Sequence, residues 1–256
     1  MESATVPATT STARRTWSRR LGLTLIVAGS LTIMWAIVVW RWQDPFTALY
    51  TTYEQHHLAQ RYQARAHRFA IAPVPRRASG SITAKALTAA IVERERAAVA
   101  REARRYRLLS HEGDPLGRII VPRLGLNMIF VDGTDTSSLE RGPGRDLDTY
   151  MPGENQLVYI AGHRTTFLAP FAHIDALKPG DRVKLELPYA TFVYSVTRHV
   201  IVPSNDLAVL RSPHHELLAL QACHPRFFAT HRYIVYARPL EVLPTGRGAR
   251  PYALHA

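Results

Sequence analysis

The pattern of apolar and polar residues separates an N-terminal segment from the rest of the chain. Residues 21–40, LGLTLIVAGSLTIMWAIVVW, form an uncharged and mostly apolar run. About 20 such residues in helical conformation suffice to cross the hydrocarbon core of a bilayer. The pattern therefore predicts one transmembrane helix over residues 21–42. It also predicts a disordered cytoplasmic N-terminus, residues 1–20, which opens with Ser, Thr and Pro.

A cleaved signal peptide is the alternative interpretation of this run. Signal peptides have an apolar region of about 7–15 residues that ends in small residues at a cleavage site. Here the run is longer, and Trp35, Trp40 and Trp42 stand at its C-terminal end, where aromatic anchors of transmembrane helices lie. The pattern favours a membrane anchor.

The charges that flank the run predict its orientation. Four arginines precede it, whereas Arg41 alone follows it before Asp44. An excess of positive charge marks the cytoplasmic side of a transmembrane helix. We therefore expect a single-pass protein of the cell membrane, with its N-terminus in the cytoplasm and the rest of the chain outside the cell. The four arginines are Arg14, Arg15, Arg19 and Arg20.

Residues 43–112 have the composition of helices separated by a linker. The segments 44–69 and 81–109 are rich in Ala, Glu, Gln and Arg, and the stretch APVPRRASGS between them is typical of a linker. The apolar stripe of the second segment is thin, with Ala90, Ile91, Val99 and Leu108. The pattern predicts a helical stalk, whose arginines either contact anionic lipid head groups or remain solvated.

The alternation changes after residue 112. Short apolar runs such as GRIIVPRLGL, QLVYIAG and ELLALQAC alternate with Gly, Pro, Asn and Asp. Regularly spaced short strands with turn residues between them are typical of a closed or sandwich-like β domain. We expect this mainly β domain to span residues 113–242, with single helical turns near residues 169–177 and 204–210. Residues 243–256 are expected to form a loose C-terminal tail.

Composition narrows the classes of function. The net charge is +12, and only three of the 32 basic residues are Lys. Such a balance is typical of proteins that bind nucleic acid or anionic membranes. The expected topology places these arginines outside the cell, so nucleic acid is not an expected partner. The single cysteine excludes an internal disulfide.

Cys223 is the strongest candidate for chemistry. In ELLALQAC the two-residue period of a strand puts Cys223 on one face with Gln221, and puts Leu218 and Leu220 on the opposite face, inside the domain. Arg232 opens the next apolar run, and a short loop would return it beside Cys223. A guanidinium there would favour the thiolate and could bind an oxyanion.

His163 completes a possible catalytic set, because it ends the run VYIAGHRTT in a glycine-flanked turn. Cysteine acyl transfer needs an imidazole that takes the thiol proton and later protonates a leaving amine. Three alternatives remain open from the residues alone. Cys223 could be a small core residue, Arg226 could replace Arg232, or Cys223 and His224 could belong to a metal site. No spacing typical of zinc ligands accompanies the last of these.

Taken together, the motifs in this part of the chain resemble the sortases, among them the class E enzymes of actinobacteria. The resemblance covers residues 113–242. It implies a closed eight-stranded β-barrel, preceded here by the transmembrane helix and the helical stalk, with no metal or cofactor. It maps a His-Cys-Arg site onto His163, Cys223 and Arg232. The motifs are GRIIVPRLGL, GPG, MPGENQLVYIAGHRTTFLAPF, IDALKPGD and ACHPRFFATHRYIVYARP.

Sortases are membrane-anchored cysteine transpeptidases. The resemblance implies cleavage of surface proteins at a C-terminal sorting signal of LAXTG or LPXTG type, between Thr and Gly, through a thioester. An amine of a peptidoglycan precursor then accepts the protein. Thr165, Thr166, Gln221 and Ala222 are the expected substrate-binding residues, and membrane lipids are further expected partners. The oligomeric state does not follow from the sequence.

Two stretches depart from the family pattern. Before Cys223 the family usually has Thr-Leu-x-Thr-Cys, whereas Ala219 and Ala222 here replace the hydroxyl residues and Gln221 is unusual. In the second stretch, Arg145 stands where relatives commonly have His. The loss of a hydroxyl before Cys223 leaves open a protein of the same fold that binds sorting signals or wall precursors without transferring them. A cysteine hydrolase of wall peptides that uses His231 as its base is a third possibility.

Overall fold

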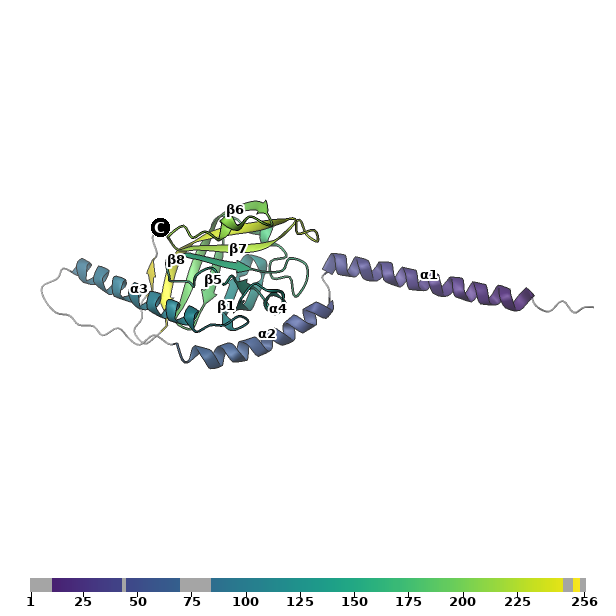
Figure 1. The fold of residues 1–256 in the computed structure, drawn as a ribbon, viewed down its shortest axis with the longest axis horizontal. Helices are drawn as coiled ribbons and strands as arrows, with labels where there is room; N and C mark the ends of the chain where they lie inside the picture. Colours follow the sequence, from purple (N-terminus) through teal and green to yellow (C-terminus); the bar gives the residue numbers. More distant parts are fainter. Residues whose placement is uncertain (1–10, 43–44, 70–83, 246–250, 254–256) are drawn as a thin grey trace, which may run out of the picture. The chain divides into compact units, whose positions relative to one another are not determined.

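A computed structural model describes residues 11–42, 45–69, 84–245 and 251–253 (Figure 1). The chain divides into two compact units, Met1–Pro45 and Phe46–Ala256. The first unit contains helix α1, Ser11–Trp42. Within α1, Trp17–Val38 is 22 residues long, has a mean hydropathy of 2.2 and is not buried, so it is long and apolar enough to cross a membrane. The helix begins ten residues earlier than the apolar run, so residues 11–20 are helical rather than disordered; residues 1–10 lie outside the described part.

The second unit begins with two helices, α2 (Pro45–Ala66) and α3 (Ala84–Leu108). The sequence predicted that these segments are helical. It also predicted a stalk separate from the β domain, whereas both helices pack against that domain. Leu58 of α2 is buried against Ile129 and Val131 of the β domain. Tyr106 of α3 is buried and donates a hydrogen bond to the carbonyl of Leu116. Both helices therefore belong to the globular unit, as Figure 1 shows. The predicted linker lies largely in residues 70–83, outside the described part.

The remaining elements form one β domain with four short helices. The strands are β1 (Pro115–Val121), β2 (Leu126–Asp132), β3 (Gly144–Arg145), β4 (Leu157–Ala161), β5 (Arg182–Glu186), β6 (Ala190–Pro203), β7 (Leu217–His224), β8 (His231–Pro244) and β9 (Tyr252–Ala253). The short helices are η1 (Pro122–Leu124), α4 (Thr136–Leu139), η2 (Ile174–Ala176) and η3 (Leu207–Leu210). The last two confirm the helical turns predicted from the sequence.

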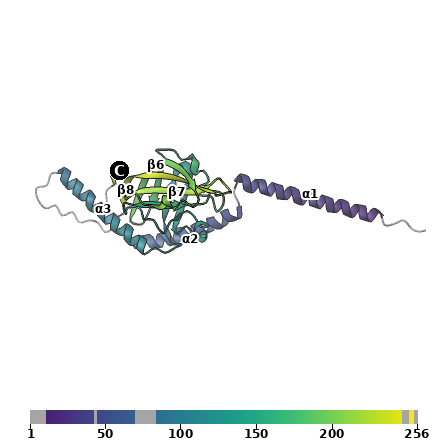
Figure 2. The ribbon, with the colours of Figure 1, turned by 45° about the horizontal axis from the view of Figure 1, so that its top comes forward.

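The strands close into a barrel. They follow the order β6-β5-β1-β2-β3-β4-β7-β8, and pairing of β6 with β8 completes the ring. This confirms the predicted eight-stranded closed barrel. Figure 2 shows β8 with its neighbours β6 and β7. Strand β9 adds to β8, where Tyr252 pairs with Val242, so the predicted C-terminal tail contains a short strand. Residues 246–250 and 254–256 of that tail lie outside the described part.

Strand β7 is apolar on both faces because each face is covered. Leu218, Leu220 and Ala222 belong to the main core inside the barrel, as the alternation predicted for the two leucines. Leu217 and Ala219 belong instead to a smaller cluster on the outer face, together with Val209 and Leu210 of η3. The members of this outer cluster are Leu157, Tyr159, Val200, Val202, Val209, Leu210, Leu217, Ala219, Ile234 and Tyr236.

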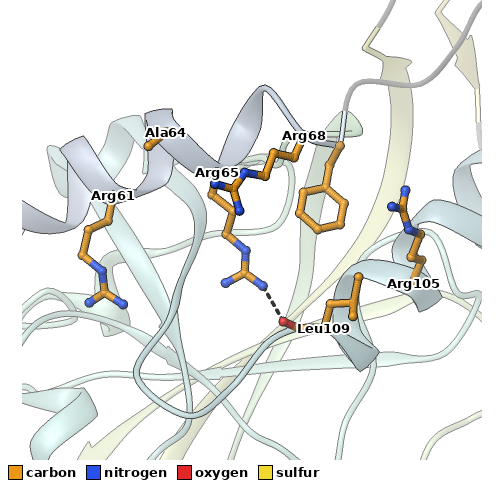
Figure 3. A pocket seen from close by; sticks show the side chains of 7 residues that line it. Arg61, Ala64, Arg65, Arg68, Arg105 and Leu109 are labelled. Carbon is orange, nitrogen blue, oxygen red and sulfur yellow. Dashed lines mark hydrogen bonds between the residues drawn. The ribbon is translucent and has the colours of Figure 1, made fainter.

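Arginines join the ends of α2 and α3 to the barrel, around the hollow in Figure 3. Arg65 forms an ion pair with Asp114 at 2.7 Å and donates to the carbonyl of Leu109 at 2.9 Å. Its Cζ lies 4.9 Å from the ring centroid of Tyr106. Arg61 also pairs with Asp114, at 3.2 Å. At least two of the arginines in these helices therefore stabilise the contact between the helices and the barrel.

Glu216, which precedes β7, predicts a pH dependence of stability. Its buried carboxylate accepts hydrogen bonds from the amides of Gly153 and Asn155 and from the hydroxyl of Tyr194. Burial nevertheless raises the pKa of Glu216 to about 7. Between pH about 4.5 and 7 the folded state then binds more protons than the unfolded state, so the free energy of unfolding falls as the pH rises, by up to about 3 kcal/mol.

Urea unfolding of the full chain in detergent at pH 5 and pH 7.5 measures this difference. Glu216→Gln keeps the size and an acceptor but cannot titrate, so its stability should vary less with pH than that of the wild-type protein. Equal pH dependence of the two proteins would contradict the assignment to Glu216.

Candidate active site

Cys223 is the penultimate residue of β7 and lies at the end of the outer cluster. It is half-buried and free, unlike the fully buried residues Leu220 and Ala222 before it. Because side chains alternate along a strand, Cys223 shares the outer face with Ala219 and Gln221. Cys223 therefore does not lie among the core residues inside the barrel. A small core residue was one of the alternatives that the sequence left open for Cys223.

Arg232 lies directly opposite Cys223 in the antiparallel pair of β7 and β8. Side chains at such positions have their Cβ atoms about 5 Å apart. The Nη1 atom of Arg232 donates to the carbonyls of Ala229 and His231, at 2.8 and 3.1 Å. These bonds hold the guanidinium at the end of the strand. The competing Arg226 lies beyond the strand end and is exposed.

His163 reaches the same end of the sheet from the other side of β7. Strands β4 and β7 are parallel, with Ala161 opposite Gln221, and the amide of Gly162 donates to the Gln221 carbonyl at 3.0 Å. Two residues beyond this last pair along both parallel strands, the same register leads to His163 and Cys223, so His163 follows the end of β4 at the level of Cys223. Strands β4, β7 and β8 thus bring His163, Cys223 and Arg232 to neighbouring positions on one edge.

Gly162 determines how the chain leaves β4. A Cβ atom at this position would lie 2.7 Å from Cδ2 of Phe171, which is fully buried. Only glycine therefore allows the segment that carries His163 to lie this close to Phe171.

The environment of His163 favours its neutral form. Its Nε2 atom is buried and has no hydrogen-bond partner among the described residues. Its ring lies 5.1 Å from the ring of Phe167. Burial lowers the pKa of His163 below its ordinary value, and the carboxylate of Glu140 offsets part of this effect. At neutral pH the imidazole can therefore accept a proton.

Arg164 is a residue of this region that the sequence reasoning missed. It is buried and forms an ion pair with Asp175 at 3.0 Å. Its Nη1 atom donates to the carbonyl of Cys223 at 3.3 Å and lies 3.0 Å from Nδ1 of His224. Arg164 thus connects the segment after β4 to the end of β7. Its place directly after the candidate histidine was the only signal in the sequence.

The four expected substrate-binding residues differ in their positions. Gln221 is half-buried on the outer face, 3.5 Å from the hydroxyl of Tyr159. Thr165 and Thr166 are half-buried after His163, and in the described part of the chain neither hydroxyl forms a hydrogen bond. Ala222 is fully buried inside the barrel. The structure therefore does not place the side chain of Ala222 on the face of Cys223, because neighbouring residues of a strand point to opposite faces.

Comparison with known proteins agrees with this architecture. Residues 119–240 match the family described as Sortase domain. Sortase D of Bacillus subtilis is 33% identical over 130 residues, which are 49% of this chain and 64% of that protein. The chain thus spans less than two thirds of the length of this relative.

Solved structures of sortases have a similar fold. A crystal structure of Sortase E1 from Streptomyces coelicolor with a tripeptide in its active site has a TM-score of 0.50 and 25% identity, over 53% of this chain and 94% of that one. A Sortase D5 transpeptidase from Clostridium perfringens has a TM-score of 0.50 and 28% identity, over 55% and 88%.

Proposed function

Residues 119–240 match the family described as Sortase domain, and from this premise we propose that the chain is a membrane-anchored cysteine transpeptidase. The observation that carries the proposal is the register of three adjacent strands, which brings His163, Cys223 and Arg232 to one edge of the barrel. We assign Cys223 as the nucleophile, His163 as the general acid and base, and Arg232 as the group that stabilises the oxyanion.

The reaction has two half-reactions in this proposal. The thiol of Cys223 gives its proton to the neutral imidazole of His163, and the sulfur attacks the threonine carbonyl of a Thr–Gly bond in the sorting signal. His163 then protonates the departing glycine amine, and a thioester remains. An amine of a wall precursor attacks that thioester, so an amide bond forms and the thiol is restored. A thioester keeps the acyl group reactive toward this second amine.

Two exposed apolar side chains support a peptide substrate. The outer cluster on the face of β7 that carries Cys223 is itself covered, but Leu207 of η3, the helix that packs on this cluster, and Phe228 of the β7–β8 loop are exposed. A short apolar sorting signal of LAXTG or LPXTG type could pack its leucine against such side chains, because burial of that leucine removes apolar area from water. We propose that Gln221, Thr165 and Thr166 supply the polar contacts.

The proposed cellular arrangement depends on α1. Its apolar stretch Trp17–Val38 would span the cell membrane, with the arginines before it in the cytoplasm and the barrel outside. Surface proteins with a sorting signal and the amine of a peptidoglycan precursor would meet the enzyme there. Matches to sortases of classes D and E agree with this proposal, and we place the chain nearest to class E on the motifs in its sequence.

Incubation of the full chain in detergent with a sorting-signal peptide and a candidate amine tests the proposal by mass spectrometry. The expected products are a peptide cleaved after threonine, an acyl adduct on Cys223 and an amide with the added amine. A peptide that binds without any cleavage would instead support the binding protein that Gln221 and Ala222 left open. Cleavage with water as the only acceptor would support the hydrolase.

Arg232→Gln is expected to lower kcat/KM for the peptide by about 10²-fold, because one oxyanion-stabilising donor contributes this much. Arg226→Gln is the matched control, since Arg226 is exposed beyond the end of β7. Its activity should stay within about twofold of wild type, as is usual for a surface substitution. A larger loss in Arg226→Gln than in Arg232→Gln would reverse the assignment. Steady-state cleavage of a quenched peptide measures both.

A further inference from the structure

The first turns of helix α2 contact the segment that follows His163. Thr47 Oγ1 accepts a hydrogen bond from the amide of Phe167, with 3.1 Å between nitrogen and oxygen. The ring of Tyr50 meets the ring of Phe167 edge-on, with centroids 6.5 Å apart and an angle of 74°. These two residues are about 120 positions from Phe167 in the sequence, and they lie outside the sortase-family domain.

The contacted segment has an unusual backbone conformation. Phe167, Leu168 and Ala169 have φ angles of 52°, 60° and 38°. Residues other than glycine rarely adopt positive φ, and they keep it only where the surroundings hold them. Within the segment, the amide of Ala169 donates to the carbonyl of Thr166 at 2.8 Å. The bond from Phe167 to Thr47 adds a partner from outside the segment.

Phe167 transmits this contact to His163. The two rings lie 5.1 Å apart at an angle of 33°, and Phe167 thus covers part of the imidazole. Thr51, one helical turn after Thr47, donates to the carbonyl of Glu140 at 2.7 Å. The charge of Glu140 acts on His163. Helix α2 therefore touches both the ring that covers His163 and the residue whose charge acts on it.

The other ionisable groups near His163 come from the barrel strands and from the segment that follows β4. Cys223 and Arg232 lie at the same edge on β7 and β8, and Arg164 is directed to Asp175 and His224. None of these residues is contacted by α2 in the interactions of the described chain.

We propose that Thr47 and Tyr50 are positioning residues of the active site, which fix the Phe167 turn and through it the imidazole of His163. The proposal rests on the proposed function for its effect on catalysis. Helix α2, which begins three residues after α1 ends, is then part of the catalytic apparatus rather than a tether. Activity would depend on residues that the family domain does not include.

The test compares four variants of the full chain in detergent. Thr47→Val removes the acceptor oxygen at nearly constant shape, and Tyr50→Ala removes the ring. Thr52→Val and Tyr53→Ala are matched controls on the same helix. Within the described part of the chain, Thr52 Oγ1 bonds to the carbonyl of Ala48 alone, and Tyr53 packs on His57. For each variant, NMR follows the titration of the His163 imidazole. The signal of this imidazole is assigned by its absence from the spectrum of His163→Asn. Peptide cleavage gives kcat, KM and their pH profiles.

Thr47→Val and Tyr50→Ala are expected to move the pKa of His163 up toward about 6.5, the ordinary value of histidine. The acidic limb of the kcat profile should move with it, because the imidazole must be neutral to accept the thiol proton. The value of kcat should fall about tenfold, since small displacements of a catalytic group have effects of this order, whereas KM should change little. The two controls should match wild type.

An unchanged titration of His163 in both Thr47→Val and Tyr50→Ala would overturn the proposal. Equal changes in the controls would also overturn it, because they would indicate a general loss of helix stability. If the NMR shift occurs but no protein cleaves or transfers the peptide, the proposed function fails while the contact between α2 and His163 stands. The two failures are therefore distinguishable.

Discussion

A Cys223→Ala variant is expected to lose cleavage of a sorting-signal peptide by at least about 10⁴-fold, the scale on which loss of a catalytic nucleophile acts. Cys223 is the only cysteine in the chain, so no other thiol can form the thioester. His163 and Arg232 keep their places on the neighbouring strands, but neither can replace the nucleophile. This is the largest effect on activity that we expect from a single substitution.

Intact-mass spectrometry after incubation with peptide measures the result directly. Wild-type protein should gain the mass of the acyl fragment once, and Cys223→Ala should gain nothing. The melting temperature serves as the control, because Cys223 is half-buried and lies outside the buried core. Cleavage by Cys223→Ala within tenfold of the wild-type rate would reject the nucleophile assignment.

Arg145→Met is expected to destabilise the barrel by about 3–5 kcal/mol, the usual result of removing one partner of a buried ion pair. The guanidinium of Arg145 lies 2.6 Å from Oδ1 of Asp132 through Nη2, and both side chains are about 2% exposed or less. Arg145 also donates to the carbonyls of Asp146 and Thr149. The substitution would leave the carboxylate of Asp132 buried without its cation.

Urea unfolding of the full chain in detergent, followed by aromatic circular dichroism, measures this loss. Arg123→Met is the matched control, because Arg123 pairs with Asp181 but is 44% exposed, and such pairs contribute at most about 1 kcal/mol. The double variant Arg145→Met with Asp132→Leu should recover much of the stability, since it removes both charges. A stability of Arg145→Met equal to that of Arg123→Met would contradict a structural role for the buried pair.

The ion pair between Arg145 and Asp132 also gives a structural reason for the arginine at position 145, which the sequence alone did not provide. Arg145 stands where sortases commonly have histidine, and the sequence offered no reason for the difference. In the structure, Arg145 of β3 pairs with Asp132 of β2, thirteen residues earlier, across the parallel contact of these strands. A partner at that distance depends on the strand register, which sequence periodicity does not specify.

The alternation of residues predicted a mainly β domain, and the resemblance to sortases predicted the closed barrel, but neither predicted what packs on it. The faces of β7 follow from period two because Leu218 and Leu220 alternate with residues of the other face. The sequence predicted a separate helical stalk for α2 and α3, because the first segment is polar and the apolar stripe of the second is thin. Their attachment depends on few buried residues, such as Leu58 and Tyr106, and on Gln55, which bonds the backbone of Ile129. Such single polar contacts leave no periodic signal.

In the candidate site, too, contacts between distant segments could not be predicted from the sequence. The motifs around His163, Cys223 and Arg232 indicated the three residues, and the register places Arg232 opposite Cys223 and ends β4 two residues before His163. Thr47 carried no signal, because its contact with Phe167 links distant parts of the chain through a main-chain amide. Any residue type has a main-chain amide, so a side chain that binds one has no recognisable partner in the sequence. Such a contact is seen only in the three-dimensional structure.

Strand β8 both closes the ring with β6 and carries Arg232. Within the barrel it is also the last long strand to be synthesised, and chains generally begin to fold from their N-terminal part. A nascent barrel without β8 would hold a thiol and an imidazole but no guanidinium beside them. Chemical competence would then arise only when the ring of strands closes. The order of synthesis would itself delay reactivity until the barrel is complete.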